Sequence, residues 1–272
     1  MIIDSHAHIY SADEAANPPV DEPLRPPDGT GSPEHLRREM DASGVDRAML
    51  IQTSSFYRWD NRYLRDTSAD ARGWAAGVCT LNPDDPHAPE ILHSLAQRSN
   101  VKGMRCVAAA DGRYDHPGVR GLWREAARLG VVINALVPLE LADELSTMLD
   151  DHRELRVVLD HCLSLKAGPD FDATVSKVVE LARHPNLHAK LTFMPTGSAE
   201  EYPFRDMHDA CKRFIEAFGP ERCVWGSDFP VELWCPRVTY GRHLRIFRDH
   251  LGLAPSDLAS VLGGTAERLW FS

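Results

Sequence analysis

The stretch MIIDSHAH, residues 1–8, is a short apolar run that leads into two histidines, and it sets the pattern that the rest of the chain repeats. Side chains alternate along a β-strand, so His6 and His8 point the same way, about 7 Å apart. Seven further segments repeat the plan of a short apolar run, most of them bounded by Gly, Pro, Asn or Asp, as in buried parallel strands. They are VDRAMLIQ (45–52), WAAGVCTL (74–81), VKGMRCV (101–107), VVINALV (131–137), LRVVLDH (155–161), LHAKLTF (187–193) and RCVWGSD (222–228).

Helical patterns lie between these strand candidates. Ser32 is a cap residue followed by Pro33 in the first turn, and Gly44 ends that helix. Further helices are predicted over residues 61–72, 86–98, 117–129, 140–151, 172–183, 204–218 and 236–250. Strands are expected to end near His8, Ile51, Leu81, Val107, Val137, His161, Phe193 and Asp228.

Eight strands alternating with helices predict an α/β fold, and eight is the number that closes a parallel barrel. We therefore predict a single (β/α)8 TIM barrel as one domain over residues 1–272. An open doubly wound sheet is the alternative, but the G-x-G-x-x-G turn of that fold is absent after the first strand. The long connections 9–31 and 52–60 follow strand ends, where barrel enzymes place substrate loops. The alternative for residues 9–31 is an unstructured surface excursion.

Composition narrows the possible partners. The formal net charge is -10, and an acidic protein repels phosphate backbones and anionic membranes. Nucleic acid and membrane are therefore poor candidates, whereas a small anionic molecule can still be bound by a local group of basic residues. The six cysteines form no C-x-x-C pair, which favours reduced thiols in a cytoplasmic protein, with Cys162 interpreted as a core residue. Neither a signal peptide nor a run of about 18 apolar residues is visible.

Four side chains at strand ends form the candidate site. His6 and His8 end the first strand, and Asp228 ends the last, which lies beside the first once a barrel closes. His161 ends the sixth strand. Taken alone, Asp228 also fits a turn or cap before Pro230, and His161 also fits a hydrogen-bonded structural role. Together they offer nitrogen and oxygen ligands that Zn2+ accepts, or a base with hydrogen-bond donors.

Two cationic residues share the inward face of their strands. The alternation in residues 187–193 turns Lys190 into the barrel, where a structural ion pair with Asp4 is the favoured interpretation. Arg105 has the same parity as Gly103 in its strand. A guanidinium at a barrel mouth can bind the carboxylate of a substrate, and the alternative is an internal ion pair.

The pieces IIDSHAH, VKGMRCV, VVLDH, HAKLT, VWGSDFP and VLGGTAERLWF together resemble the amidohydrolase-related family of the amidohydrolase superfamily. They look closest to its lactonase branch, which includes 2-pyrone-4,6-dicarboxylate lactonase and sugar-lactone hydrolases. The decarboxylase branch is next. The resemblance implies a barrel with His6, His8, His161 and Asp228 in the active site. Thr265 stands where the family usually has Asn.

Two further departures bear on function. Many metal-dependent members carry a histidine at the end of strand five, where this chain has Ala135-Leu136-Val137. We therefore expect at most one divalent metal ion, with zinc the candidate, and a site that works without an ion stays open. The lactonases often place a glycine and an arginine after the strand-six histidine, where this chain has residues 162–166 (CLSLK), so a dicarboxylate substrate is not assured.

The resemblance and the site residues together predict a hydrolase that opens a small carboxylated or sugar lactone. Asp228 is expected to act as general base on water, while His6, His8 and His161 bind a metal or the carbonyl oxygen. Arg105 is expected to orient an anionic group of the substrate. A metal-dependent non-oxidative decarboxylase and a catalytically inactive barrel that serves as a binding protein are the alternatives.

Overall fold

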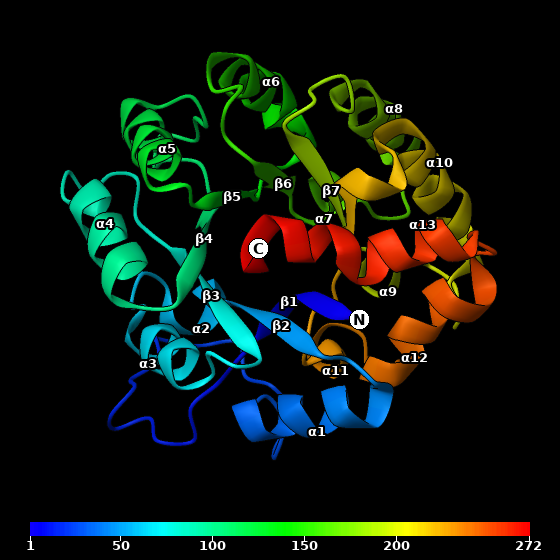
Figure 1. Ribbon diagram of the computed structural model, residues 1–272, viewed down its shortest axis with the longest axis horizontal. Coiled ribbons are helices and arrows are strands. Elements are labelled where there is room, and N and C mark those ends of the chain that lie inside the picture. Colours follow the sequence, from blue (N-terminus) through cyan, green and yellow to red (C-terminus); the bar gives the residue numbers. More distant parts are fainter.

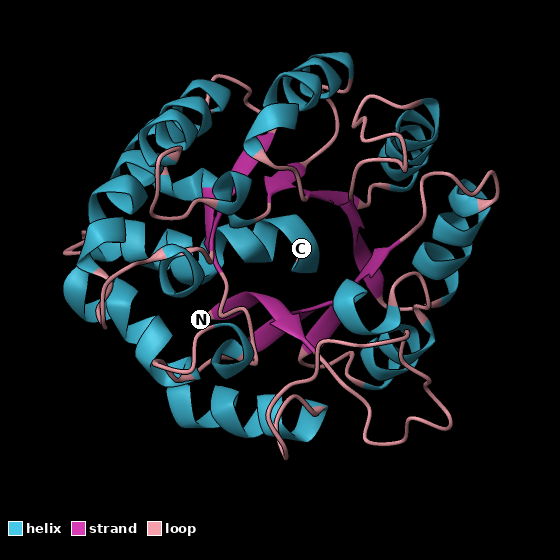
Figure 2. Cartoon of the chain, turned by 180° about the vertical axis from the view of Figure 1, so that it is seen from behind, coloured by secondary structure: helices cyan, strands magenta, loops and turns pink.

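Eight parallel strands follow one another in sequence order around a closed ring (Figures 1 and 2). The computed structural model describes residues 1–272. Closure is made by backbone hydrogen bonds from Asp228 N–H to His6 O, 2.9 Å, and from His8 N–H to Phe229 O, 2.7 Å. The predicted barrel is confirmed. Its strands are β1 (Ile3–His8), β2 (Arg47–Ile51), β3 (Ala75–Thr80), β4 (Val101–Cys106), β5 (Val132–Ala135), β6 (Val157–Leu159), β7 (Leu187–Leu191) and β8 (Cys223–Trp225).

Helices cover the outside of the ring, as Figure 2 shows. In the first of them, the side chain of Ser32 accepts the N–H of His35, and Gly44 ends the helix at a φ of 70°. No helix is both long and apolar enough to span a bilayer. The longer helices are α1 (Pro33–Ser43), α3 (Arg62–Asp70), α4 (Ala88–Arg98), α5 (Pro117–Leu129), α6 (Ala142–Asp151), α8 (Phe171–Leu181), α10 (His208–Phe218) and α12 (Tyr240–Arg245).

Short helical turns follow several strands on the side where the strands end. They are α2 (Ser54–Tyr57), α7 (His161–Ser164), α9 (Met194–Gly197) and α11 (Val231–Trp234). Several strands are shorter than predicted: β6 stops at Leu159 and β8 at Trp225. The backbone leaves the sheet at these points, so the polar residues that follow lie on turns above the strands rather than within them.

The loop over residues 9–31 contains no helix or strand but is tied to α2. Backbone N–H groups of Val20 and Leu24 donate to the carbonyl oxygens of Phe56 and Ser55, at 2.8 and 3.2 Å. Tyr10, at the start of the loop, packs in a buried cluster with Phe56 and Tyr57. These contacts hold the loop against the neighbouring connection instead of leaving it free.

The amino-terminal end of the barrel is filled by the last segment of the chain. This segment begins with α13 (Pro255–Ala259) and continues to Phe271 mainly as π-helical turns, which are wider than α-helical turns. In Figure 1 it crosses the centre of the ring. A Cβ on Gly263 would lie 2.4 Å from the carbonyl oxygen of Met1, so the close approach to the start of β1 requires glycine. The apolar interior cluster joins Ala266, Leu269 and Trp270 to side chains of the strands, among them Ile3, Met49, Ile51, Ala76, Val78, Val132, Val158 and Val224.

Candidate active site

A pocket of about 430 Å³ lies where the strands end. Imidazoles, one carboxylate, hydroxyls and an indole form its wall. His6 is not part of the wall: it is fully buried inside the barrel and contacts the wall residues from there. The lining residues are His8, Ser54, Ser55, Arg105, Leu136, His161, Ser164, Leu165, Lys166, Phe193, Thr196, Asp228 and Trp234.

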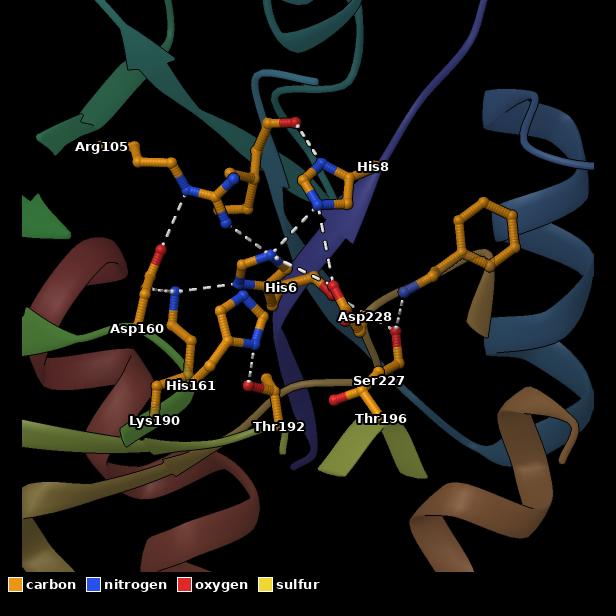
Figure 3. A network of polar contacts seen from close by, with 12 residues as sticks. His6, His8, Arg105, Asp160, His161, Lys190, Thr192, Thr196, Ser227 and Asp228 are labelled. Carbon is orange, nitrogen blue, oxygen red and sulfur yellow. Dashed lines mark hydrogen bonds and ion pairs between the residues drawn. The ribbon is translucent and has the colours of Figure 1, made fainter. Parts of the chain in front are cut away.

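The structure brings the four residues of the predicted site together (Figure 3). The Nε2 atoms of His6 and His8 are 3.2 Å apart. Oδ1 of Asp228 lies 3.4 Å from the first of these atoms and 3.7 Å from the second. The ring of His161 is 4.7 Å from the ring of His6, centroid to centroid. Barrel closure therefore makes one cluster from strands at opposite ends of the sequence.

Asp228 lies on a sharp turn after β8. A Cβ on Gly226 would lie 2.7 Å from Cβ of His6, so glycine lets this turn approach β1. Asp228 itself has a φ of 59°, in the left-handed region that few residues other than glycine adopt. Burial raises the pKa of its carboxyl group to about 7, against the opposing charge of Arg105. The carboxylate is therefore a base that titrates near neutral pH.

Three buried charged side chains, those of Arg105, Asp160 and Lys190, form a layer below the pocket, which we call the ion layer. Lys190 Nζ is 2.7 Å from Oδ1 of Asp160, and Arg105 Nε donates to Oδ2 of the same carboxylate at 3.0 Å. Asn134 also donates to Asp160, at 3.2 Å. Burial opposes ionisation of Asp160, yet the charges of Lys190 and Arg105 hold its pKa below the ordinary value.

The predicted ion pair between Lys190 and Asp4 is wrong. Strands β6 and β7 are neighbours, with Leu159 paired to Ala189, so the next residues, Asp160 and Lys190, come side by side. Asp4 instead accepts two hydrogen bonds from Ser227, from the backbone N–H and from the hydroxyl. Arg105 combines both interpretations of the sequence, because it belongs to the internal ion layer and also lines the pocket.

His6 lies between two cations. Nη2 of Arg105 is 2.8 Å from its Nε2, and Nζ of Lys190 is 3.3 Å from its Nδ1. Burial and these two charges lower the pKa of His6 well below the ordinary value. His6 is therefore neutral at physiological pH.

His8 and His161 are also neutral. Nδ1–H of His8 donates a hydrogen bond to the carbonyl oxygen of Ile51 at 3.1 Å, which leaves the lone pair of Nε2 facing the site. Burial lowers the pKa of His8 to about 3 and that of His161 to about 3. Nδ1 of His161 is 2.7 Å from Oγ1 of Thr192, so the other ring nitrogen can face the pocket.

The sequence predicted that His161 ends the sixth strand, and this prediction is wrong. Strand β6 ends two residues earlier, and His161 opens a turn in which four successive residues have φ between 47° and 60°. This left-handed turn carries the imidazole to His6. Cys162, the second residue of the turn, packs in the main core as expected. All six cysteines are free and buried.

The donor atoms fit one divalent metal ion. Ligand atoms held about 2.1 Å from a tetrahedral zinc ion lie roughly 3.4 Å from one another. The separations among His6, His8 and Asp228 are close to this value, and one donor atom each of His6, His161 and Asp228 lies within 4.8 Å of the others. Arg105 donates to the same Nε2 of His6 that an ion would use, so the guanidinium and an ion compete for that lone pair.

Sequence reasoning missed several residues of the site. Asp160 lies directly after the apolar run of β6 and before His161, and a carboxylate in that position is a signal that it belongs to the site. His243, whose Nδ1 is 3.1 Å from the carbonyl oxygen of Ser227, comes from a helix with no motif around it. Ser54 and Trp234 come from short helical turns whose position only the fold defines.

A protein-family model described as Amidohydrolase matches residues 3–271. The chain belongs to this amidohydrolase family. The family recognised from the sequence motifs is thereby confirmed, and the chain is an enzyme of hydrolase type.

The names of two relatives of this amidohydrolase refer to sugar lactones. The L-fucono-1,5-lactonase of Burkholderia ambifaria is 27% identical over 241 residues, which cover 86% of this chain and 83% of the relative. The D-galactarolactone isomerase of Agrobacterium fabrum is 25% identical over 242 residues, which cover 86% and 78%. Among solved structures, a probable 2-pyrone-4,6-dicarboxylic acid hydrolase from Acinetobacter baumannii with bound citric acid has a TM-score of 0.84 at 17% identity. That match covers 99% of this chain and 98% of the other, and it shows the shared barrel.

Proposed function

We propose that this amidohydrolase opens a small sugar lactone by base-assisted attack of water. The observation that carries the proposal is the position of Asp228 in the pocket wall, with Oδ1 3.4 Å from Nε2 of His6 and 3.7 Å from Nε2 of His8. In addition, burial raises the pKa of this carboxyl group to about 7. A base works best when its pKa lies near the working pH, because it is then both ionised and basic. The names of the two relatives support a lactone as the substrate.

The reaction uses Asp228 twice. Its carboxylate takes a proton from water while the water oxygen attacks the carbonyl carbon of the lactone. The bond between that carbon and the ring oxygen then breaks. The proton held by Asp228 passes to the ring oxygen, so the product is an open hydroxy acid and the carboxylate is regenerated.

Arg105 and His161 stabilise the charge that develops on the carbonyl oxygen. Arg105 lines the pocket and has more N–H donors than its contacts with Asp160 and His6 use. His161, whose Nδ1 contacts Thr192, offers its other ring nitrogen. Hydrogen-bond donors that are already in position around the forming oxyanion are usually the largest single contribution to the rate enhancement.

His6, His8 and Asp228, with His161 close by, would hold a single divalent ion, for which zinc is the candidate. When bound, the ion would polarise the carbonyl group and acidify water. The neutral imidazoles described above suit metal binding, since a ligating histidine must be unprotonated. Without such an ion, the same imidazoles serve as fixed hydrogen-bonding groups.

The pocket wall favours a substrate that carries hydroxyl groups. Hydroxyl side chains are contributed by Ser54, Ser55, Ser164 and Thr196. Oγ of Ser54 and Nε1 of Trp234, both on residues of the wall, have no hydrogen-bond partner in the protein. Lys166 is the one cation of the wall outside the ion layer, which suits at most one carboxylate on the substrate.

A panel of lactones tests this proposal. We expect the purified enzyme to open aldono-1,5-lactones and aldarolactones, and to act far more slowly on 2-pyrone-4,6-dicarboxylate, with acid release followed by a pH indicator. Fastest turnover of the dicarboxylate would contradict the proposed substrate class. Failure on every lactone would overturn the function, with release of CO2 from hydroxybenzoates pointing to a decarboxylase. Tight lactone binding without turnover would point to an inactive binding protein.

The location in the cell stays a prediction. Six free, buried thiols are what a reducing compartment such as the cytoplasm favours.

A further inference from the structure

Asp4 is a fully buried carboxylate that the proposed reaction does not use. Its Oδ1 accepts the backbone N–H groups of Ser227, at 2.8 Å, and of His6, at 3.0 Å. Its Oδ2 accepts the hydroxyl of Ser227 at 2.6 Å. One carboxylate of β1 therefore binds the residue that precedes Asp228.

Ser227 passes this restraint to both sides of Asp228. Its hydroxyl oxygen accepts the N–H of Phe229 at 2.9 Å, which bridges over Asp228. Its carbonyl oxygen, in the peptide bond that leads into Asp228, accepts the Nδ1–H of His243 at 3.1 Å. The N–H of Asp228 is itself bound to the carbonyl oxygen of His6 at 2.9 Å.

This set of bonds surrounds a residue in an unfavourable backbone conformation. The φ of 59° at Asp228 persists only if the surrounding contacts over-determine it. Released from them, the turn would relax, and the carboxylate would leave the positions 3.4 and 3.7 Å from the two imidazoles of β1. A displacement of about 1 Å at a reacting group can lower the rate by about 10²-fold.

We propose that Asp4 is a positioning residue, which acts through Ser227 to hold Asp228 in its left-handed conformation against His6 and His8. For its kinetic readout the proposal rests on the proposed function. The competing interpretation is that the same bonds only close the barrel between β1 and β8. That interpretation predicts a loss of stability without a specific loss of turnover.

The experiment compares Ser227→Ala with Ser5→Ala. Both serines are fully buried, but the hydroxyl of Ser5 has no partner in the protein, so its removal is the matched control. We expect Ser227→Ala to lower kcat by about 10- to 100-fold with KM changed less than about twofold. Ser5→Ala should stay within about twofold of the wild type in both constants.

Variants of Asp4 test the same link by rescue. Asn at position 4 keeps an oxygen for the two backbone N–H groups, whereas Ala keeps none. Asp4→Asn should therefore retain a larger share of kcat than Asp4→Ala, and it keeps the proposal testable if Ala prevents folding. Adding Ser227→Ala to Asp4→Asn should lower kcat little beyond the worse single variant, because both residues act as one unit.

A crystal structure of Ser227→Ala separates this proposal from the proposed function. We expect the distance from Asp228 Oδ1 to His6 Nε2 to exceed its present 3.4 Å. If the wild type opens no lactone, the proposed function fails while this distance still tests the positioning role. An unchanged distance, or a kcat equal to that of Ser5→Ala in a folded Ser227→Ala, would overturn the proposal.

Discussion

Replacing Asp228 by Asn removes the proposed base while keeping the shape of the side chain. The amide retains an oxygen that can face the imidazoles of His6 and His8, but it cannot take a proton from water. General base catalysis is typically worth about 10²–10⁴-fold. We therefore expect kcat to fall at least about 10²-fold, which corresponds to a barrier higher by about 2.7 kcal/mol. KM should change far less, because the binding contacts remain.

The same substitution should not weaken the fold. The pKa of about 7 in the folded chain lies above the ordinary value of 3.8, so folding favours the protonated carboxyl. Stability from this group is present below the ordinary pKa and is lost as the pH rises through about 7. At about pH 8 the folded wild type carries a buried charge that lowers the free energy of unfolding by an amount on the order of a few kcal/mol. Asn removes that charge, so Asp228→Asn should unfold at the same or a higher urea concentration.

The assay is lactone opening at about pH 8, where most of the wild-type carboxylate is ionised. His188→Ala is the control: Nδ1 of His188 contacts the carbonyl oxygen of Val157 at 3.2 Å, and the residue does not line the pocket. This variant should keep most of its activity if it folds. A folded Asp228→Asn with nearly wild-type turnover would refute the reasoning, and His161 would then be the next candidate for the base.

Three further predictions concern pH, stability and metal content. Because Asp228 acts only when ionised, kcat/KM should fall about tenfold per pH unit below about pH 7, and a flat profile there would contradict its role as base. Lys190→Met leaves the buried Asp160 paired with Arg105 alone and should lower the free energy of unfolding in urea by about 1.5–3 kcal/mol. The exposed Lys166→Met should stay within about 0.5 kcal/mol, and equal effects would contradict the ion layer. Elemental analysis should find at most one divalent ion per chain, and two tightly held ions would contradict this prediction. Loss of activity on chelation, with recovery on addition of zinc, would establish a metal-dependent reaction.

Much of the barrel was predictable because its signals are local. Short apolar runs predict the strands, and capping residues such as Ser32 and Gly44 mark helix ends that the structure reproduces. The wide helical turns up to Phe271 were not assigned. Their burial depends on contact with the far end of the barrel, such as the approach of Gly263 to Met1, and no local pattern encodes that contact.

The site was predictable as far as strand order goes. A closed barrel places Asp228 next to His6 and His8, and this adjacency follows from the sequence alone. The partner of Lys190 did not follow, because it depends on the register between β6 and β7. The left-handed turn at His161 was also hidden, since its conformation is imposed by packing rather than by glycine.

The helical segment that fills the amino-terminal end of the barrel has a consequence for how the protein is made. Ala266, Leu269 and Trp270 cover interior side chains contributed by strands along the whole chain. A ribosome synthesises these three residues after all eight strands. Until these residues emerge, the interior side chains at the amino-terminal end of a nascent barrel stay exposed to water and can associate with other chains. The barrel is therefore expected to reach its native packing only after translation has passed Trp270.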